Sequence, residues 1–145
     1  MALFTSKVDY ALRALLDLAK QPPGRPAQSR EIAGRQGIPE SYLNQLLVVL
    51  RRAGLVRSVR GAAGGYVLGR EPHLLSAAHV VEALHGPDLL GDFGSESVTP
   101  AAWAIRNLHE RLNSAVQQEL ERTTLSDLLA DVHRLDETQS LMLGL

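Results

Sequence analysis

The stretch between residues 29 and 54 constrains the fold most, because it places two helix patterns on either side of a sharp turn. The segment SREIAGRQ, residues 29–36, is typical of a short helix with Ser29 as its cap. GIP follows as the turn, in which Gly37 suits a left-handed backbone. PESYLNQLLVVLRRAG, residues 39–54, then predicts a longer helix. Two helices joined by a glycine-containing turn are typical of a helix-turn-helix.

The next segment, RSVRGAAGGYVLGR, combines arginines with glycines and one tyrosine in residues 57–70. Apolar residues alternate in residues 55–60 and again in residues 65–68, which predicts two strands joined around GAAG. A phosphate-binding P-loop would need a lysine followed by serine or threonine and then a helix, and this segment has neither. The hairpin is therefore a tight structural turn, a basic finger that contacts nucleic acid, or both.

Helical spacing of apolar residues predicts further helices in residues 5–21, 76–86, 99–123 and, as a short one, 125–132. Their expected caps are Ser6, Ser76 and Thr99, with Pro100 in the first turn. Residues 87–98 lack periodicity and are expected to form a loop. The predicted fold class is mostly α with a small β-hairpin wing. A winged helix-turn-helix region would occupy residues 1–70, and connecting and dimerisation helices would occupy residues 71–145.

Charge divides sharply between these two halves. Residues 1–70 hold eleven Lys and Arg against four Asp and Glu, a net charge of +7, whereas residues 71–145 carry −8. A basic half joined to an acidic half indicates a module that binds a polyanion and is attached to something else. Chance clustering of solvated charges is the alternative interpretation.

Polar side chains in the first turns of the 39–54 helix are the candidates for reading DNA bases. They are Ser41, Tyr42, Asn44 and Gln45. Asn and Gln match the hydrogen-bonding edge of adenine, and Ser can donate or accept. The alternative is an ordinary pair of helices with a polar face.

The tip of the predicted hairpin, between Gly61 and Gly64, has little side-chain bulk and could approach a DNA backbone closely. Arg60 would then enter the minor groove, where the negative potential is strongest, and Arg57 and Arg70 would contact phosphates. The glycines could equally serve only to permit the turn.

Apolar residues of the 99–123 helix recur at alternating spacings of four and three, a seam suited to pairing with another helix. This seam consists of Ala101, Ile105, Leu108, Leu112 and Ala115. Trp103 lies near the start of the same helix and is expected either in the core or in the wall of a pocket at the dimer interface. The predicted dimer interface is therefore Trp103, Ile105, Leu108, Leu112 and Ala115.

Several classes of function are excluded or disfavoured. The chain has no cysteine, so it cannot form disulfides, thiolate zinc sites or cysteine-ligated iron–sulfur clusters. It lacks a nucleophile-elbow motif and paired carboxylates, so no enzymatic activity is expected. His79, Glu82 and His85 follow at spacings of three, which is a weak pattern for a metal site. No apolar run approaches the ~20 residues that span a bilayer, and the charged N-terminal residues do not suit a signal peptide, so a cytoplasmic protein is expected.

These segments together resemble the IscR/NsrR/CymR (Rrf) family of bacterial winged-helix transcriptional regulators. The resemblance rests on SYLNQLLVVLRRAGLVRSVRGAAGGYVLGR, KVDYALRALLDLA, SAAHVVEALHG and LNSAVQQELERTTLSDLL, and covers nearly all of residues 3–130. It implies a homodimer crossed through the long helix that binds a pseudo-palindromic operator, with Arg60 in the minor groove. Asn44 stands where several relatives have Glu, which implies a different preferred operator.

The chain departs from this family in one respect. Many members hold an iron–sulfur cluster on three cysteines before the long helix, with a histidine in some, whereas Ser97 and Pro100 stand at such positions here. The chain therefore resembles the clusterless branch, for which a small molecule or a partner protein is the expected effector. The function predicted is a DNA-binding regulator, most simply a repressor, without cofactor. The alternatives are a protein-interaction module that has lost DNA binding and a metal-responsive regulator.

Overall fold

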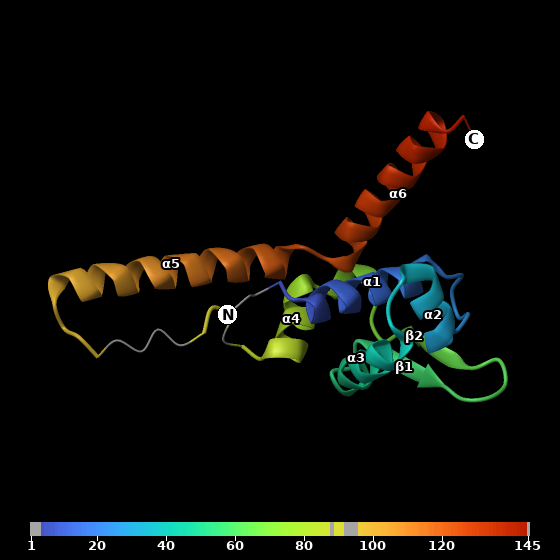
Figure 1. The fold of residues 1–145 in the computed structure, drawn as a ribbon, viewed down its shortest axis with the longest axis horizontal. Coiled ribbons are helices and arrows are strands. Elements are labelled where there is room, and N and C mark those ends of the chain that lie inside the picture. The colour runs from blue at the N-terminus through green and yellow to red at the C-terminus, as the bar shows by residue number, and fades with distance from the viewer. Residues whose placement is uncertain (1–3, 88, 92–95, 145) are drawn as a thin grey trace.

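The computed structural model describes residues 4–87, 89–91 and 96–144. Its elements follow in the order α1 (Ser6–Lys20), α2 (Ser29–Gln36), α3 (Glu40–Arg52), β1 (Val56–Val59), β2 (Gly65–Leu68), the 3-10 helix η1 (Pro72–Leu74), α4 (Ala77–His85), α5 (Pro100–Arg122) and α6 (Leu125–Met142) (Figure 1). This order confirms the predicted fold class, in which a mostly helical chain carries one antiparallel hairpin and a long helix in its C-terminal half.

Helix α1 lies at the centre of the fold and contacts α2, α3, α4, α6 and β2. Its apolar residues recur every three or four positions, so they share one face, and that face is buried. The buried apolar residues of α1 are Val8, Ala11, Leu12, Ala14, Leu15 and Leu18. They belong to a single cluster of buried side chains that also includes Leu43 and Leu47 of α3 and Val80 and Val81 of α4. The core therefore extends across residue 70, where the sequence suggests a boundary between two regions.

The turn between α2 and α3 has the predicted geometry. Gly37 adopts a left-handed backbone with φ 64°, and Pro39 caps α3. The cap of α2 is Gln28 and not Ser29, because the side chain of Glu31 accepts a hydrogen bond from the Gln28 backbone N–H at 3.0 Å. Helix α1 likewise begins at Ser6, and Thr5 is its cap residue.

The predicted strands form a two-stranded antiparallel hairpin with Val56 opposite Leu68 and Val59 opposite Gly65. A third segment joins its edge, because Ala27 and Tyr66 exchange two backbone hydrogen bonds. Ala27 N–H donates to Tyr66 O at 3.0 Å, and Tyr66 N–H donates to Ala27 O at 2.8 Å. The order across the sheet is therefore Ala27, β2, β1. This contact connects the loop between α1 and α2 to the wing, residues 56–68.

The C-terminal half contains α4, α5 and α6. The caps of α4 and α5 are Ser76 and Thr99, as predicted. The 125–132 helix was predicted too short, because α6 continues to Met142. Hydrogen bonds between Thr124 and Asp127 start α6, and no proline or glycine interrupts it before Gly144. Helix α5 extends from the body as an arm, and α6 leaves the body in another direction (Figure 1).

The predicted loop 87–98 is described only in part, and residues 88 and 92–95 lie outside the described residues. Its described residues form no helix or strand. None of the helices in the described parts of the chain combines the length and the apolar character needed to cross a bilayer.

One buried charge connects α1 to α2. The Asp17 side chain is 4% exposed, and its carboxylate accepts hydrogen bonds from Arg35 Nε at 2.9 Å and Arg35 Nη2 at 2.8 Å. Gln36 Nε2 donates a further hydrogen bond at 3.2 Å. The hydrogen bonds to Asp17 raise the pKa of the Arg35 guanidinium above its ordinary value. Because three donors satisfy this carboxylate, its burial is compatible with a stable fold.

Replacing Asp17→Asn should lower the free energy of unfolding by about 1–3 kcal/mol, because the negative charge beside Arg35 is lost and one of the two acceptor oxygens becomes a donating NH2 group. The effect should stay below that of a fully buried pair, since the Arg35 side chain is 40% exposed. Urea unfolding at one fixed protein concentration measures it. Asp9→Asn is the matched control, because Asp9 is 50% exposed and lies 3.8 Å from Arg13. Equal effects of the two substitutions would contradict a stabilising role for the Asp17 contact.

Candidate nucleic-acid interface

The first turns of α3 present polar side chains to solvent while the opposite face is buried. Ser41, Asn44 and Gln45 are exposed. Leu43, Leu46, Leu47 and Leu50 form the buried face. This arrangement leaves Ser41, Asn44 and Gln45 available to base edges, as the second helix of a helix-turn-helix requires.

Tyr42 differs from its neighbours because it is half-buried. Its ring packs edge-on against Tyr10 of α1, with 5.6 Å between ring centroids, and the Arg13 guanidinium lies 5.1 Å from the Tyr10 ring centroid. Part of the Tyr42 side chain therefore fixes the position of α3 on α1. A contact between Tyr42 and DNA stays a prediction.

A groove of about 540 Å³ lies between the end of α3 and β1, and three arginines line it. Arg57 and Arg60 were predicted as DNA contacts, and Arg51 of α3 joins them here. The sequence analysis missed Arg51. A signal for it was available, because Arg51 and Arg52 lie in the last turn of α3, directly before the wing.

The tip of the wing is built around glycines for steric reasons. A Cβ on Gly64 would lie 2.2 Å from Val59 O, and one on Gly65 would lie 2.5 Å from Ala27 O. Gly64 N–H donates to Gly61 O at 3.0 Å, which closes the turn. The side chains of Ala62 and Ala63 are exposed at the tip. The glycines therefore allow the turn and the close approach of the Ala27 segment, and they also leave a narrow tip.

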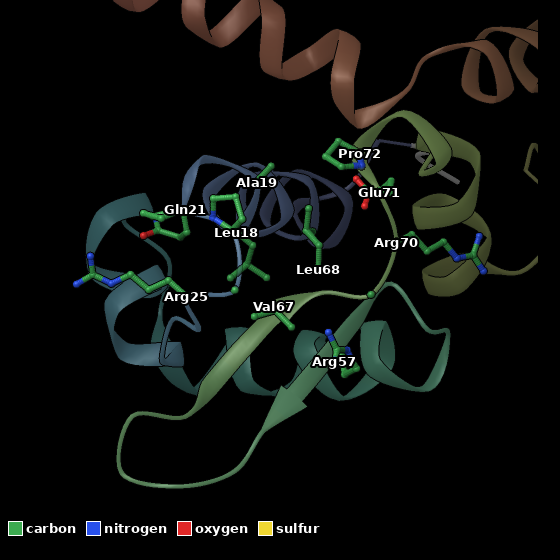
Figure 2. A pocket seen from close by; sticks show the side chains of 14 residues that line it. Leu18, Ala19, Gln21, Arg25, Arg57, Val67, Leu68, Arg70, Glu71 and Pro72 are labelled. Carbon is green, nitrogen blue, oxygen red and sulfur yellow. The ribbon is translucent and has the colours of Figure 1, made fainter.

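Arg70 lies apart from the three arginines of the groove. Its guanidinium is directed toward α4, with Nη1 3.3 Å from His79 Nε2 (Figure 2). Arg57 lies on the wing side of the hollow drawn in Figure 2. A phosphate contact by Arg70 stays a prediction, and it would require the side chain to leave His79.

Apart from Arg70, which lies beside His79, the basic side chains of the first half fall into two groups. Those close to the body have acidic partners: Arg13 pairs with Asp9, Lys20 with Asp136, and Arg35 with Asp17. Seven others are exposed and have neither an ion pair nor a side-chain hydrogen bond among the described residues. They are Lys7, Arg25, Arg30, Arg51, Arg52, Arg57 and Arg60. Three of the four carboxylates in this half, Asp9, Asp17 and Glu31, are already paired with Arg13 or Arg35, so this surface keeps its positive charge.

Helix α5 exposes the predicted apolar seam. Ile105 is 51% exposed, Leu108 43% and Leu112 51%, and the only buried residue of α5 is Leu120. Ala101 and Ala115 of the seam are also exposed. Trp103 is 64% exposed, so it does not belong to the core of this chain. It lies two positions before Ile105 and therefore points to nearly the opposite side of the helix.

The candidate metal ligands do not come together. His79 Nδ1 accepts from the Ser76 backbone N–H at 3.0 Å, and His85 Nε2 lies 3.0 Å from Thr5 Oγ1. The part of the chain that the structure describes contains no group of three His, Cys, Asp or Glu that could hold a metal ion. Ser97 offers a hydroxyl where the resemblance places a cysteine, and a hydroxyl does not replace a thiolate as an iron–sulfur ligand.

Known regulators resemble this chain over most of its length. CymR of Bacillus subtilis is 40% identical over 128 residues, which cover 86% of this chain and 87% of CymR. IscR of Vibrio parahaemolyticus is 35% identical over 151 residues, which cover 97% of this chain and 85% of IscR. Both are named HTH-type transcriptional regulators.

Solved structures agree with this comparison. The structure of CymR, described as the global cysteine regulator of B. subtilis, superposes with a TM-score of 0.79 at 39% identity. The match covers 90% of this chain and 98% of that one. The T. potens IscR structure has a TM-score of 0.74 at 36% identity, covering 89% of this chain and 87% of that one.

The sequence profile of the Rrf2 family, described as an iron-dependent transcriptional regulator, matches residues 4–131. This match includes the helix-turn-helix, the wing, α4 and α5. The named relatives and the superposed structures agree with this match. The chain therefore belongs to the Rrf2 family of winged helix-turn-helix, DNA-binding transcriptional regulators.

Proposed function

We propose that the protein acts as a homodimeric repressor that binds a pseudo-palindromic operator and carries no iron–sulfur cluster. The observation that carries this proposal is the set of seven exposed, unpaired cations in the half that holds α3 and the wing. Phosphate neutralisation by such side chains supplies much of the affinity of a protein for DNA. Repression would follow when the bound dimer occupies promoter DNA.

Two kinds of contact with DNA are expected: base contacts from α3, and minor-groove and phosphate contacts from the wing. Ser41, Asn44 and Gln45 would face base edges in the major groove, because they are exposed in the first turns of α3. Arg60 would enter the adjacent minor groove, and Arg57 would contact its phosphates. The geometry of the hairpin supports this division, because Arg57 and Arg60 line a groove that begins at the end of α3.

Pairing of two chains through α5 is supported by the exposed seam on a helix that otherwise has little contact with its own body. Apolar side chains that recur every three or four residues on a solvent-exposed helix are stabilised when a partner helix covers them. Two recognition helices in a symmetric dimer would meet major grooves about one helical turn apart, so the operator would be pseudo-palindromic.

The absence of thiolate donors supports regulation without a cluster. The family is described as iron-dependent, but this chain has no cysteine, and its described His, Asp and Glu side chains form no metal-binding group. No step of the proposed mechanism therefore involves iron. A small molecule or a partner protein would supply the signal instead.

The operator and the base-reading residues can be identified together by selecting bound sequences from a random duplex pool. The wild-type chain should enrich a pseudo-palindromic sequence. Asn44→Ala should lose discrimination at one position in each half-site, at a cost of about 1–3 kcal/mol, because one side chain reads one base pair. Gln139→Ala is the control, since it removes an exposed amide from α6. A loss of affinity that is equal for all DNA sequences would mean that Asn44 contacts only the sugar–phosphate backbone of the DNA.

Arg60→Ala should weaken binding to the selected operator and reduce the slope of log K against log salt concentration by about one for each half-site, hence by about two for the dimer, because each wing loses one phosphate or groove contact. Mobility shifts over a salt series measure this slope. Arg122→Ala removes a cation from the end of α5, where Arg122 pairs with Glu119, and should leave the slope unchanged. If Arg60→Ala also leaves the salt slope unchanged, the assignment of the wing to the minor groove is wrong.

Leu108→Asp should convert the dimer into a monomer, because the charge would be buried without a partner in the middle of the seam. Light scattering at matched protein concentrations gives the molecular mass. Ser114→Asp places the same charge on the same helix, but two positions beyond Leu112 and hence near its opposite side, so this variant should stay dimeric. Dimers that persist in Leu108→Asp would place the interface elsewhere.

A further inference from the structure

The wing has a second cleft on the side away from the three-arginine groove. This cleft has a volume of about 500 Å³ and lies between the loop that precedes α2 and the wing tip. Its walls include Gly24, Arg25 and Pro26 on one side and Ala62, Ala63 and Gly64 on the other. Arg25 is the only cation among the residues that line it.

The loop that carries Arg25 is held in place by its backbone. Arg25 N–H donates to Pro22 O at 3.1 Å, which closes a turn, and Ala27 exchanges two hydrogen bonds with Tyr66. Prolines at positions 22, 23 and 26 restrict the remaining backbone freedom. This loop can approach β2 closely because residue 65 is glycine. A Cβ at that position would lie only 2.5 Å from Ala27 O. Backbone hydrogen bonds therefore attach the loop that carries Arg25 to the wing, close to the wing tip.

The Arg25 side chain itself is free to bind. It is exposed, it has no ion pair or side-chain hydrogen bond among the described residues, and it points outward from the loop (Figure 2). Glu31 is the one carboxylate that lines the cleft, and it is already engaged. Its Oε1 accepts from the Gln28 backbone at 3.0 Å, and its Oε2 lies 3.8 Å from Arg35 Nη1.

The order Ala27, β2, β1 places the two clefts on opposite edges of the wing. Arg51 and Arg60 line the groove along the β1 edge, and Arg25 lies on the loop that Ala27 joins to β2. Arg57 of β1 lines both that groove and the hollow of Figure 2, which Arg25 also lines. A minor groove is about 6 Å wide and has a phosphate strand on each side. A wing tip inside that groove would therefore have one strand beside each of its edges.

We infer that Arg25 binds a DNA phosphate on the strand opposite the one that the β1 edge contacts, so that the wing holds the minor groove from both sides. This inference rests on the proposed function, because it requires the wing to enter the minor groove. The ligand is the phosphodiester backbone, so Arg25 contributes affinity at this site with little dependence on base sequence.

The test compares the wild-type chain with Arg25→Ala on the duplex selected from the random pool. Arg25→Ala should reduce the salt slope by about 1.8 and weaken binding roughly 25- to 100-fold near 0.1 M salt, because the dimer loses one phosphate contact in each half-site and each contact contributes about 0.9 to the slope. Arg25→Lys should retain most of the slope. Arg134→Ala, which removes an exposed cation of α6 that pairs with Asp131, is the matched control and should change nothing. Phosphate-ethylation interference should show one sensitive phosphate fewer in each half-site with Arg25→Ala.

The outcomes separate this inference from the proposed function. If Arg25→Ala and Arg134→Ala keep the wild-type slope and interference pattern while Arg60→Ala loses affinity, the Arg25 contact is wrong and DNA binding by the wing stands. If the wild-type chain fails to shift any duplex in dilute buffer, the proposed function falls, and the Arg25 contact falls with it.

Discussion

Burial of one face of α1 is the packing interaction on which the rest of the structure depends. That face contacts the helix-turn-helix on one side and α4 and α6 on the other, so both halves of the chain share one core. Leu15 is fully buried, and Asp17 on the same helix receives three donors from α2. The edge-on contact of Tyr10 with Tyr42 extends this packing to the start of α3. Helix α3 is thus positioned by α1 and not by the short turn before it alone.

This packing also determines where positive charge remains on the surface. Carboxylates in the first half are few, and three of the four are paired with Arg13 or Arg35 close to the body. Cations at the end of α3, in the wing and in the loop before α2 consequently have no protein partner among the described residues. The same division between paired and unpaired charges explains why a chain with a net charge of −1 can bind a polyanion.

Local patterns in the sequence were sufficient for most of the fold. Helical periodicity and capping residues predicted the helices near their observed bounds, and alternating residues around glycines predicted the hairpin. The features that sequence reasoning missed depend on contacts between distant segments. Three such features are the pairing of Ala27 with Tyr66, the packing of Tyr42 on Tyr10, and the groove that Arg51 and Arg57 both line, and no periodicity relates the residues involved. The length of α6 was missed for a different reason, because its exposed second half lacks the apolar stripe that marks a packed helix.

The connection between Ala27 and Tyr66 has an evolutionary consequence, because it uses main-chain atoms alone. Main-chain hydrogen bonds persist when side chains change, so the side chain at position 25 can vary without detaching this loop from the hairpin. The flanking prolines and Gly24, whose φ is 76°, fix the loop backbone instead. A substitution at position 25 can therefore change the charge beside the wing tip while α3 and the hydrophobic core stay as they are.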